Sequence, residues 1–104
     1  MPLPQLTPEV RAEALAKAIS VRKERGALLK ALKSGSLSLP ALLERDDEVI
    51  AKTYVRRVLE SLPGVGRVRA RELLIELGIA ETRRVQGLGP RQRERLCQQF
   101  PPSD

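Results

Sequence analysis

The chain contains no histidine and only one cysteine, Cys97, in 104 residues. The lack of histidine excludes histidine-based catalytic triads and histidine metal clusters, and a single cysteine cannot form an intramolecular disulfide. Cys97 lies between Leu96 and Phe100 on the apolar side of a predicted helix. We therefore expect it to be a small core residue and not a reactive thiol.

Aromatic residues and long apolar runs are also scarce. Tyr54 and Phe100 are the only aromatic residues, too few for the stacking platform that single-strand binding uses, so a nucleic-acid partner would be a duplex. No segment approaches the roughly 18 apolar residues of a membrane span, and "MPLPQLTPEV" lacks the features of a signal peptide. We expect a cytoplasmic protein with no membrane contact.

Basic residues, by contrast, are abundant. The chain carries 19 lysines and arginines against 13 acidic residues, a formal charge of +6, and 14 of the 19 are arginine. A guanidinium pairs two oxygens at once, so this excess favours a partner that bears phosphate. Charge alone does not decide the matter, because many basic proteins bind no nucleic acid.

The first third of the chain predicts one long helix after a proline-rich tail at residues 1–6. Thr7 is suited to the N-cap and Pro8 to the first helical position, and Gly35 can end the helix, so we assign residues 7–35 to it. The helix of about 27 residues is roughly 40 Å long. In its first half the apolar face consists mostly of alanine, and the charged block "RKER" at 22–25 interrupts this row of apolar residues. We expect that half to project beyond the core, or to order only with a partner.

Residues 36–100 predict a compact helical domain, followed by a tail at 101–104. A short helix begins after Ser38, a second spans 48–61, a third follows the glycine loop and ends at Gly78, and a last one begins near Pro90. No segment alternates long enough for a strand, so the fold class is all-α. The expected inward residues are Ala51, Val55, Val58, Leu59, Leu62, Ala70, Leu73, Leu74, Leu77, Leu96, Cys97 and Phe100.

Four acidic residues lie close together at Glu44, Asp46, Asp47 and Glu48. They resemble a metal or acid/base site, but no partner carboxylates occur at a matching spacing elsewhere. We interpret Asp47 as a helix N-cap whose neighbours favour the positive end of the helix dipole. The sequence therefore predicts no catalytic residue and no metal ligand.

A repeat connects two glycine-containing segments. A shift of 23 residues aligns "LPGVGRVRAREL" at 62–73 with "VQGLGPRQRERL" at 85–96. Glycines at a helix N-terminus allow positive φ and let a phosphate approach the unpaired amides. Two such loops side by side would hold two nearby phosphates; the alternative is two tight turns with solvated arginines. The repeat favours phosphate binding, together with six arginines: Arg67, Arg69, Arg71, Arg91, Arg93 and Arg95.

Several blocks resemble a known family. "LPGVGRVRA", "LGIAETRRVQGLG" and "RQRERLCQQF", with the N-terminal "LTPEVRAEALAKA" and "RKER", are similar to the actinobacterial-type integration host factors. The resemblance spans nearly the whole chain. It implies a long N-terminal helix packed on a helix-two-turns-helix domain. It also implies a nucleoid-associated protein that binds double-stranded DNA with little sequence preference, bends and organises it, and supports phage integration.

The resemblance also implies a set of contact residues. The hairpin of the family falls on Gly64, Val65, Gly66 and Arg67, and its basic cluster on Arg83, Arg84 and the next polar position, where Gln86 stands instead of a basic residue. Arg69 is expected to contribute mainly to the positive electrostatic potential near this hairpin. The second loop contributes Gly87 and Gly89.

Three further expectations concern partners. Lys30, Lys33 and Ser36 on or next to the long helix would form a second DNA surface. We expect no cofactor, although hairpins of this kind can hold a monovalent cation on their carbonyls. The partners would be duplex DNA and phage integrase–DNA complexes, and the absence of an extended dimer seam favours a monomer.

Two other functions remain open at this stage. A small-subunit ribosomal protein shares the "PGVG" hairpin arrangement, but this chain lacks its long basic tail and ends in "PPSD". DNA glycosylases use the same two-turn motif, some with an N-terminal proline as nucleophile, a role for which Pro2 would be available. Against this function, Leu3 occupies the position where such an enzyme would need an acidic residue, and no residues remain to form a pocket for a damaged base.

Overall fold

The computed structural model describes residues 7–45 and 47–102. It contains six α-helices in that part of the chain: α1 (Pro8–Ser34), α2 (Leu39–Glu44), α3 (Glu48–Ala51), α4 (Val55–Glu60), α5 (Arg67–Leu77) and α6 (Pro90–Gln99), with a 3₁₀ turn, η1 (Val85–Gly87), before α6. The only strand-like pairing among the described residues is an isolated bridge between Tyr54 and Arg84. The predicted all-α class is confirmed.

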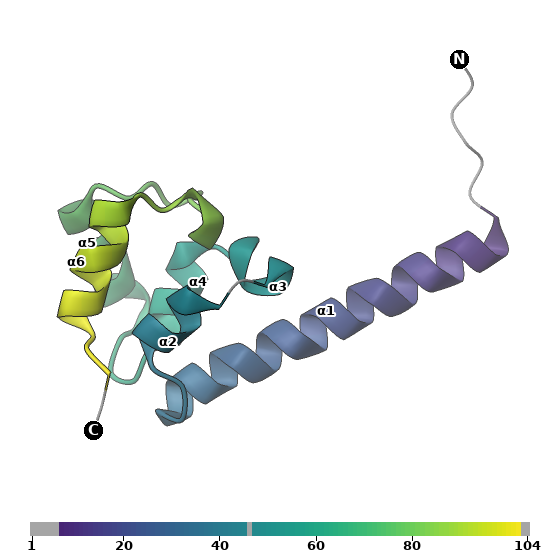
Figure 1. Cartoon of the computed structure of the whole chain (residues 1–104), viewed down its shortest axis with the longest axis horizontal. Coiled ribbons are helices and arrows are strands. Elements are labelled where there is room, and N and C mark those ends of the chain that lie inside the picture. Colours follow the sequence, from purple (N-terminus) through teal and green to yellow (C-terminus); the bar gives the residue numbers. More distant parts are fainter. Residues whose placement is uncertain (1–6, 46, 103–104) are drawn as a thin grey trace, which may run out of the picture.

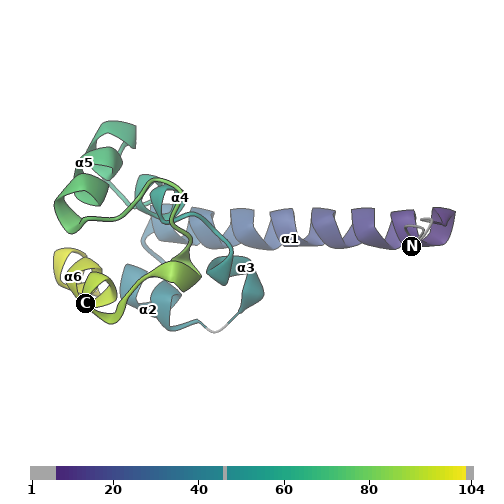
Figure 2. The same cartoon turned by 90° about the horizontal axis from the view of Figure 1, so that it is seen from above.

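Helix α1 has the predicted ends and projects from the rest of the molecule (Figures 1 and 2). Thr7 Oγ1 accepts the Val10 N–H at 3.1 Å, and Gly35 ends the helix with φ +82°. Residues 8–20 are all exposed, and Val21 is the first to be half-buried. The helix reaches the core only at its C-terminal end, where Leu32 is completely buried.

The core lies among α2 to α6 and the end of α1. Leu73 and Leu96, which occupy equivalent positions in the repeat, are both buried, as predicted. Ala51, Cys97 and Phe100 are half-buried, and the last two pack only against the edge of this core, so the prediction that the three lie inside is too strong. None of the described helices combines the length and apolar character that crossing a bilayer requires.

The predicted single helix over 48–61 is wrong, because the chain breaks at Lys52–Tyr54 into α3 and α4. Thr53 is buried, and its hydroxyl donates to the Val49 carbonyl at 2.7 Å. The Val55 N–H donates to the Arg83 carbonyl at 3.0 Å, and the Val85 N–H donates to the Thr53 carbonyl at 2.9 Å. The break therefore pairs the backbone before α4 with a segment 30 residues away, which helical periodicity cannot indicate.

Asp47 caps α3, as the sequence predicts. Its carboxylate accepts the Ile50 N–H at 2.9 Å and the Arg45 Nε–H at 2.7 Å, and the backbone hydrogen bond is the main reason that its pKa is lowered. A lowered pKa in the folded state means that this cap stabilises the fold at neutral pH and loses its effect as the pH falls through that pKa. Asp46, the neighbouring acidic residue, lies outside the described residues.

Candidate nucleic-acid interface

The two glycine loops of the repeat lie at opposite ends of α4. Loop 1 (residues 61–66) follows the C-terminus of α4, whereas loop 2 (residues 82–89) pairs with Tyr54 at its N-terminus. In Figure 1 the green loop that carries η1 runs along the top of the domain, away from the end of α1. The prediction of side-by-side loops is therefore wrong: six residues of helix, about 9 Å, separate them.

Loop 1 has an open backbone. Gly64 adopts φ +76°, which glycine tolerates best, and Gly66 is the N-cap of α5 with no side-chain hydrogen bond to the helix N-terminus. A Cβ added to either glycine would meet nothing within 4 Å among the described residues. The unpaired amides at the start of α5 are thus accessible to an anion, and the helix dipole favours one there.

Basic side chains surround these amides. Lys33 from the end of α1, Arg57 from α4 and Arg67 from α5 line an open groove of about 600 Å³ along loop 1. Glu60 also lines it, but its carboxylate already accepts a hydrogen bond from Arg56 at 2.9 Å. Within the part of the chain that the structure describes, the three basic residues have no ion-pair partner and leave the groove positively charged.

Alanine substitutions at the two glycines of loop 1 should have different effects. Gly64→Ala should lower the free energy of unfolding by about 1–2 kcal/mol, because a Cβ is strained at φ +76°. Gly66→Ala has φ −97° and should cost less than about 1 kcal/mol as an N-cap change, yet weaken binding of a duplex by blocking the backbone. Thermal unfolding and fluorescence anisotropy measure the two effects. If Gly66→Ala bound duplexes like wild type, no phosphate would approach the backbone at this residue.

Loop 2 is built differently, despite the similar sequence. The Gly89 N–H donates to Gln92 Oε1 at 3.0 Å, and Pro90 has no N–H, so the start of α6 offers fewer free amides. Neither Gly87 nor Gly89 has positive φ, contrary to the role that we predicted for glycines at both loops. A phosphate at loop 2 would therefore be bound mainly by the side chains of Arg83 and Arg84 and not by backbone amides.

Arg83 explains the glycine at position 87. Its Nη1 donates to the Gly87 carbonyl at 2.9 Å. A Cβ on Gly87 would lie 2.9 Å from Arg83 Cδ, too close for the present position of that side chain. Gly87 thus makes room for the arginine and fixes its guanidinium at the surface, next to exposed Gln86.

Arg84 is held by a residue that sequence reasoning missed. Its guanidinium carbon lies 4.9 Å from the centre of the Tyr54 ring, and Nη1 donates to the Lys52 carbonyl at 3.3 Å. Such stacking restricts the arginine while leaving it exposed. Tyr54 stands 30 residues earlier, and only the backbone bridge between the two segments brings it here.

The other arginines have varied environments. Arg69 pairs with Glu72 at 3.4 Å and with Glu76 at 3.6 Å, so part of its expected field is neutralised. Arg93 is half-buried and donates to the carbonyls of Leu43 and Val85 at 3.2 and 3.0 Å. It links α6 to α2 and η1. We therefore assign Arg93 a structural role in place of the phosphate contact that the sequence suggested.

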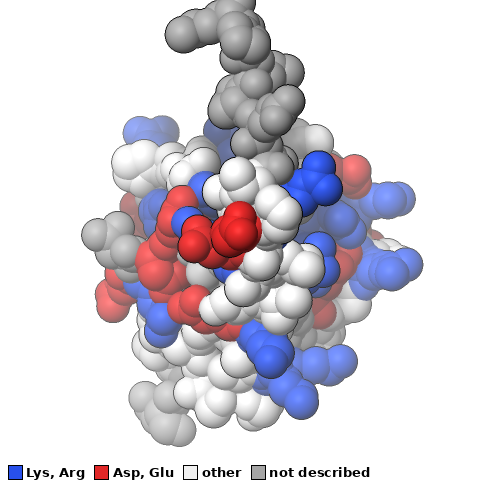
Figure 3. All heavy atoms as spheres, turned by 90° about the vertical axis from the view of Figure 1, so that its right-hand side faces the viewer, with Lys and Arg blue, Asp and Glu red and all other residues white. Residues whose placement is uncertain are grey.

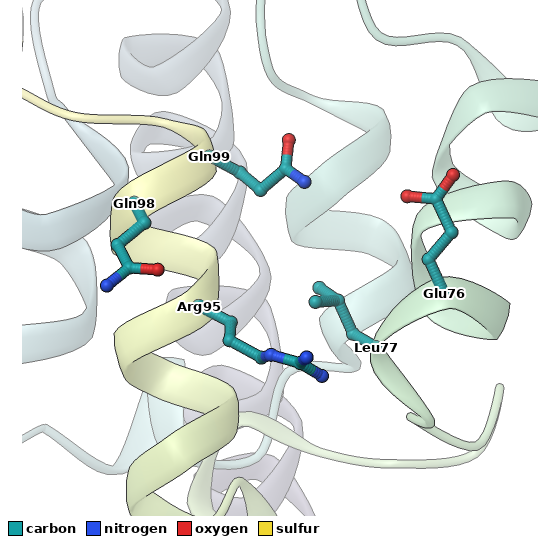
Figure 4. A pocket seen from close by; sticks show the side chains of 5 residues that line it. All are labelled: Glu76, Leu77, Arg95, Gln98 and Gln99. Atoms are coloured by element: carbon teal, nitrogen blue, oxygen red, sulfur yellow. The ribbon is translucent and has the colours of Figure 1, made fainter.

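Arg95 lines a hollow of about 420 Å³ between α5 and α6. Figure 4 shows its side chain extending from α6 toward Leu77, with Glu76 on the α5 side and Gln98 and Gln99 above. This hollow shares no lining residue with the groove of loop 1.

The three residues of the predicted second DNA surface do not lie together in one groove. Lys33 joins the groove of loop 1, while Lys30 and Ser36 are exposed but do not line it. The Ser36 hydroxyl donates to the Ala31 carbonyl at 3.2 Å. Figure 3 looks along α1 from its N-terminal side: many blue lysine and arginine atoms lie on the right and at the lower right, and red acidic atoms lie left of the centre. The right-hand side of that view is the farther side of Figure 1, where α5 lies.

Comparisons with known proteins agree with this architecture. Residues 32–100 match the family described as "S13-like H2TH domain", so the helices and loops define a helix-two-turns-helix protein. The chain is 49% identical over 102 residues to the integration host factor of Mycobacterium tuberculosis, covering 96% of this chain and 97% of that protein. The integration host factor of Streptomyces coelicolor is 47% identical over 102 residues, covering 96% and 95%. The chain belongs to this family of actinobacterial-type integration host factors.

A solved structure is also similar. It is described as sIHF bound to an 8-base-pair palindromic DNA, and it matches with a TM-score of 0.80 and 42% sequence identity, over 82% of this chain and 98% of that one. The expected long N-terminal helix on a helix-two-turns-helix domain thus has a solved counterpart.

Proposed function

We propose that this protein is a DNA-architectural protein of the nucleoid that binds duplex DNA with little sequence preference, through phosphate contacts at loops 1 and 2. The observation that carries the proposal is loop 1, where the free amides of α5 lie beside Lys33, Arg57 and Arg67. Amides and cations of this kind hold phosphate oxygens without reading the attached base. Specificity would then come from how easily the DNA deforms.

The relatives support the same conclusion. Proteins of nearly the same length are named integration host factors, and the solved relative is bound to duplex DNA. By this kinship, we assign the chain a role in bending and organising DNA and in supporting phage integration, with integrase–DNA complexes as partners. It would act in the cytoplasm, at the nucleoid, as a monomer and without enzymatic activity. A monovalent cation on the carbonyls of loop 1 remains part of the proposal.

The two other functions have distinct tests. Ribosomal RNA binding predicts that the protein sediments with ribosomes, whereas DNA binding predicts that it sediments with the nucleoid. The lyase function needs Pro2, which lies outside the described residues. It predicts a covalent adduct that borohydride traps on abasic DNA.

The binding experiment uses fluorescence anisotropy with two duplexes of unrelated sequence and one folded RNA of equal length. We expect similar affinity for both duplexes and weaker binding of the RNA, since an A-form helix spaces its phosphates differently. Tighter binding of the RNA, or a large preference for one duplex, would overturn the proposal.

A further inference from the structure

Three surface grooves adjoin one another along the face that α4 and α5 share, because each has lining residues in common with the next. The groove of loop 1 shares Glu60 and Arg67 with a second groove of about 400 Å³. The second shares Arg56 and Arg71 with a third of about 370 Å³. The third ends at Tyr54, on which Arg84 of loop 2 stacks. The two loops are therefore connected across the surface, although they lie at opposite ends of α4.

This α4–α5 groove is predominantly basic. Five basic side chains and two acidic ones line it: Lys33, Arg56, Arg57, Arg67, Arg71, Glu60 and Glu81. The acidic residues pair with the two arginines in the middle, Arg56 with Glu60 at 2.9 Å and Arg71 with Glu81 at 3.2 Å. Arg71 is largely exposed, with 72% of its side chain accessible, whereas Arg56 is half-buried at 43% and pairs with a Glu60 side chain that is 22% accessible. An exposed ion pair such as that of Arg71 is weak, so a phosphate can compete with its carboxylate, and Arg56 still presents close to half of its side chain to solvent.

We propose that the α4–α5 groove binds the phosphate backbone of one DNA strand, with Arg56 and Arg71 contacting phosphates between loop 1 and loop 2. The proposal rests on the proposed function and extends it to two residues in the middle of the groove. One strand of a duplex carries a phosphate about every 3.4 Å along the axis, so the roughly 9 Å of α4 spans about three phosphates. The interface thus becomes one continuous contact instead of two separate ones.

The test measures the affinity of full-length protein for one duplex as a function of salt, for wild type and the double variant Arg56→Gln/Arg71→Gln. Each lost phosphate contact should lower the slope of log affinity against log salt by about 0.9. If both contacts are lost, the ratio of wild-type affinity to variant affinity should therefore fall by about 12-fold when the salt is raised from 50 to 200 mM. Glu81→Gln should have the opposite effect and tighten binding, because it releases Arg71 from its ion pair.

Two comparisons make the result decisive. Arg45→Gln removes one positive charge, against two in the double variant, from an ion pair that lies outside the three grooves, and it should leave the slope unchanged. Circular dichroism and thermal unfolding check that each variant folds. If Arg56→Gln/Arg71→Gln kept the wild-type slope while variants of loop 2 lost affinity, the continuous groove would be wrong and the proposed function would stand. If no variant of either loop or of the groove changed binding, both would fail.

Discussion

Replacement of Arg83 and Arg84 together by glutamine should weaken duplex binding by at least about tenfold at low salt, and by a similar factor on unrelated sequences. Both guanidiniums are held at the surface, Arg83 by the Gly87 carbonyl at 2.9 Å and Arg84 by the Tyr54 ring at 4.9 Å. Held in this way, they lose little entropy when a phosphate binds. Gln86, the next polar residue, supplies no charge next to them. Anisotropy with two unrelated duplexes measures the effect.

A pair of glycine variants in the same loop separates positioning from charge. Gly87→Ala retains both arginines but displaces Arg83, because the new Cβ would lie 2.9 Å from Cδ. It should therefore weaken binding in part. Gly89→Ala is the matched control: its Cβ would meet only Gln92 Oε1, at an ordinary 3.8 Å. A loss of affinity confined to one DNA sequence would instead indicate base readout by this loop.

Replacement of Arg93 by methionine should lower the free energy of unfolding by about 2–3 kcal/mol, because the half-buried carbonyls of Leu43 and Val85 lose a charged donor. For a domain of this size the melting temperature should fall by about 10–20 °C. At a temperature where the variant is fully folded, its affinity for DNA should stay close to that of wild type.

Arg91→Met is the matched control on the same helix. Arg91 is exposed and makes no side-chain hydrogen bond or ion pair within the described residues. Its replacement removes an equal charge and should leave the melting temperature within a few degrees. If the Arg93 variant melted like wild type but had lost DNA binding, the structural role assigned to Arg93 would be wrong.

The elements that depend on local signals were predictable from the sequence. Thr7, Pro8 and Gly35 give both ends of α1, Asp47 gives the start of α3, and the 3.6-residue period of α5 gives its buried face. Each signal acts within a few residues, so reading along the chain is enough to find it. The resemblance to a family supplied the rest of the fold class.

The arrangement of the candidate site was harder to predict, because it depends on contacts between distant segments. Periodicity makes 48–61 one helix, whereas the buried Thr53 and its pairing with the segment at 83–85 divide it. That division places the two loops at opposite ends of α4 and brings Tyr54 under Arg84. The two halves of the repeat have similar sequences but differ at the helix N-terminus. The Gln92 side chain accepts a hydrogen bond from the Gly89 N–H, whereas no side chain caps the start of α5 at loop 1.

The salt dependence of duplex affinity tests the central claim, binding through phosphate contacts, most directly. The measurement takes the dissociation constant of the wild-type protein on two unrelated duplexes between 50 and 200 mM salt. Contacts from Lys33, Arg57, Arg67, Arg83 and Arg84 predict a log–log slope of about −4 to −5 on both duplexes, at roughly −0.9 per phosphate, and the two further contacts of the α4–α5 groove bring it to about −6. A slope near zero, or a steep slope on one duplex alone, would contradict the account.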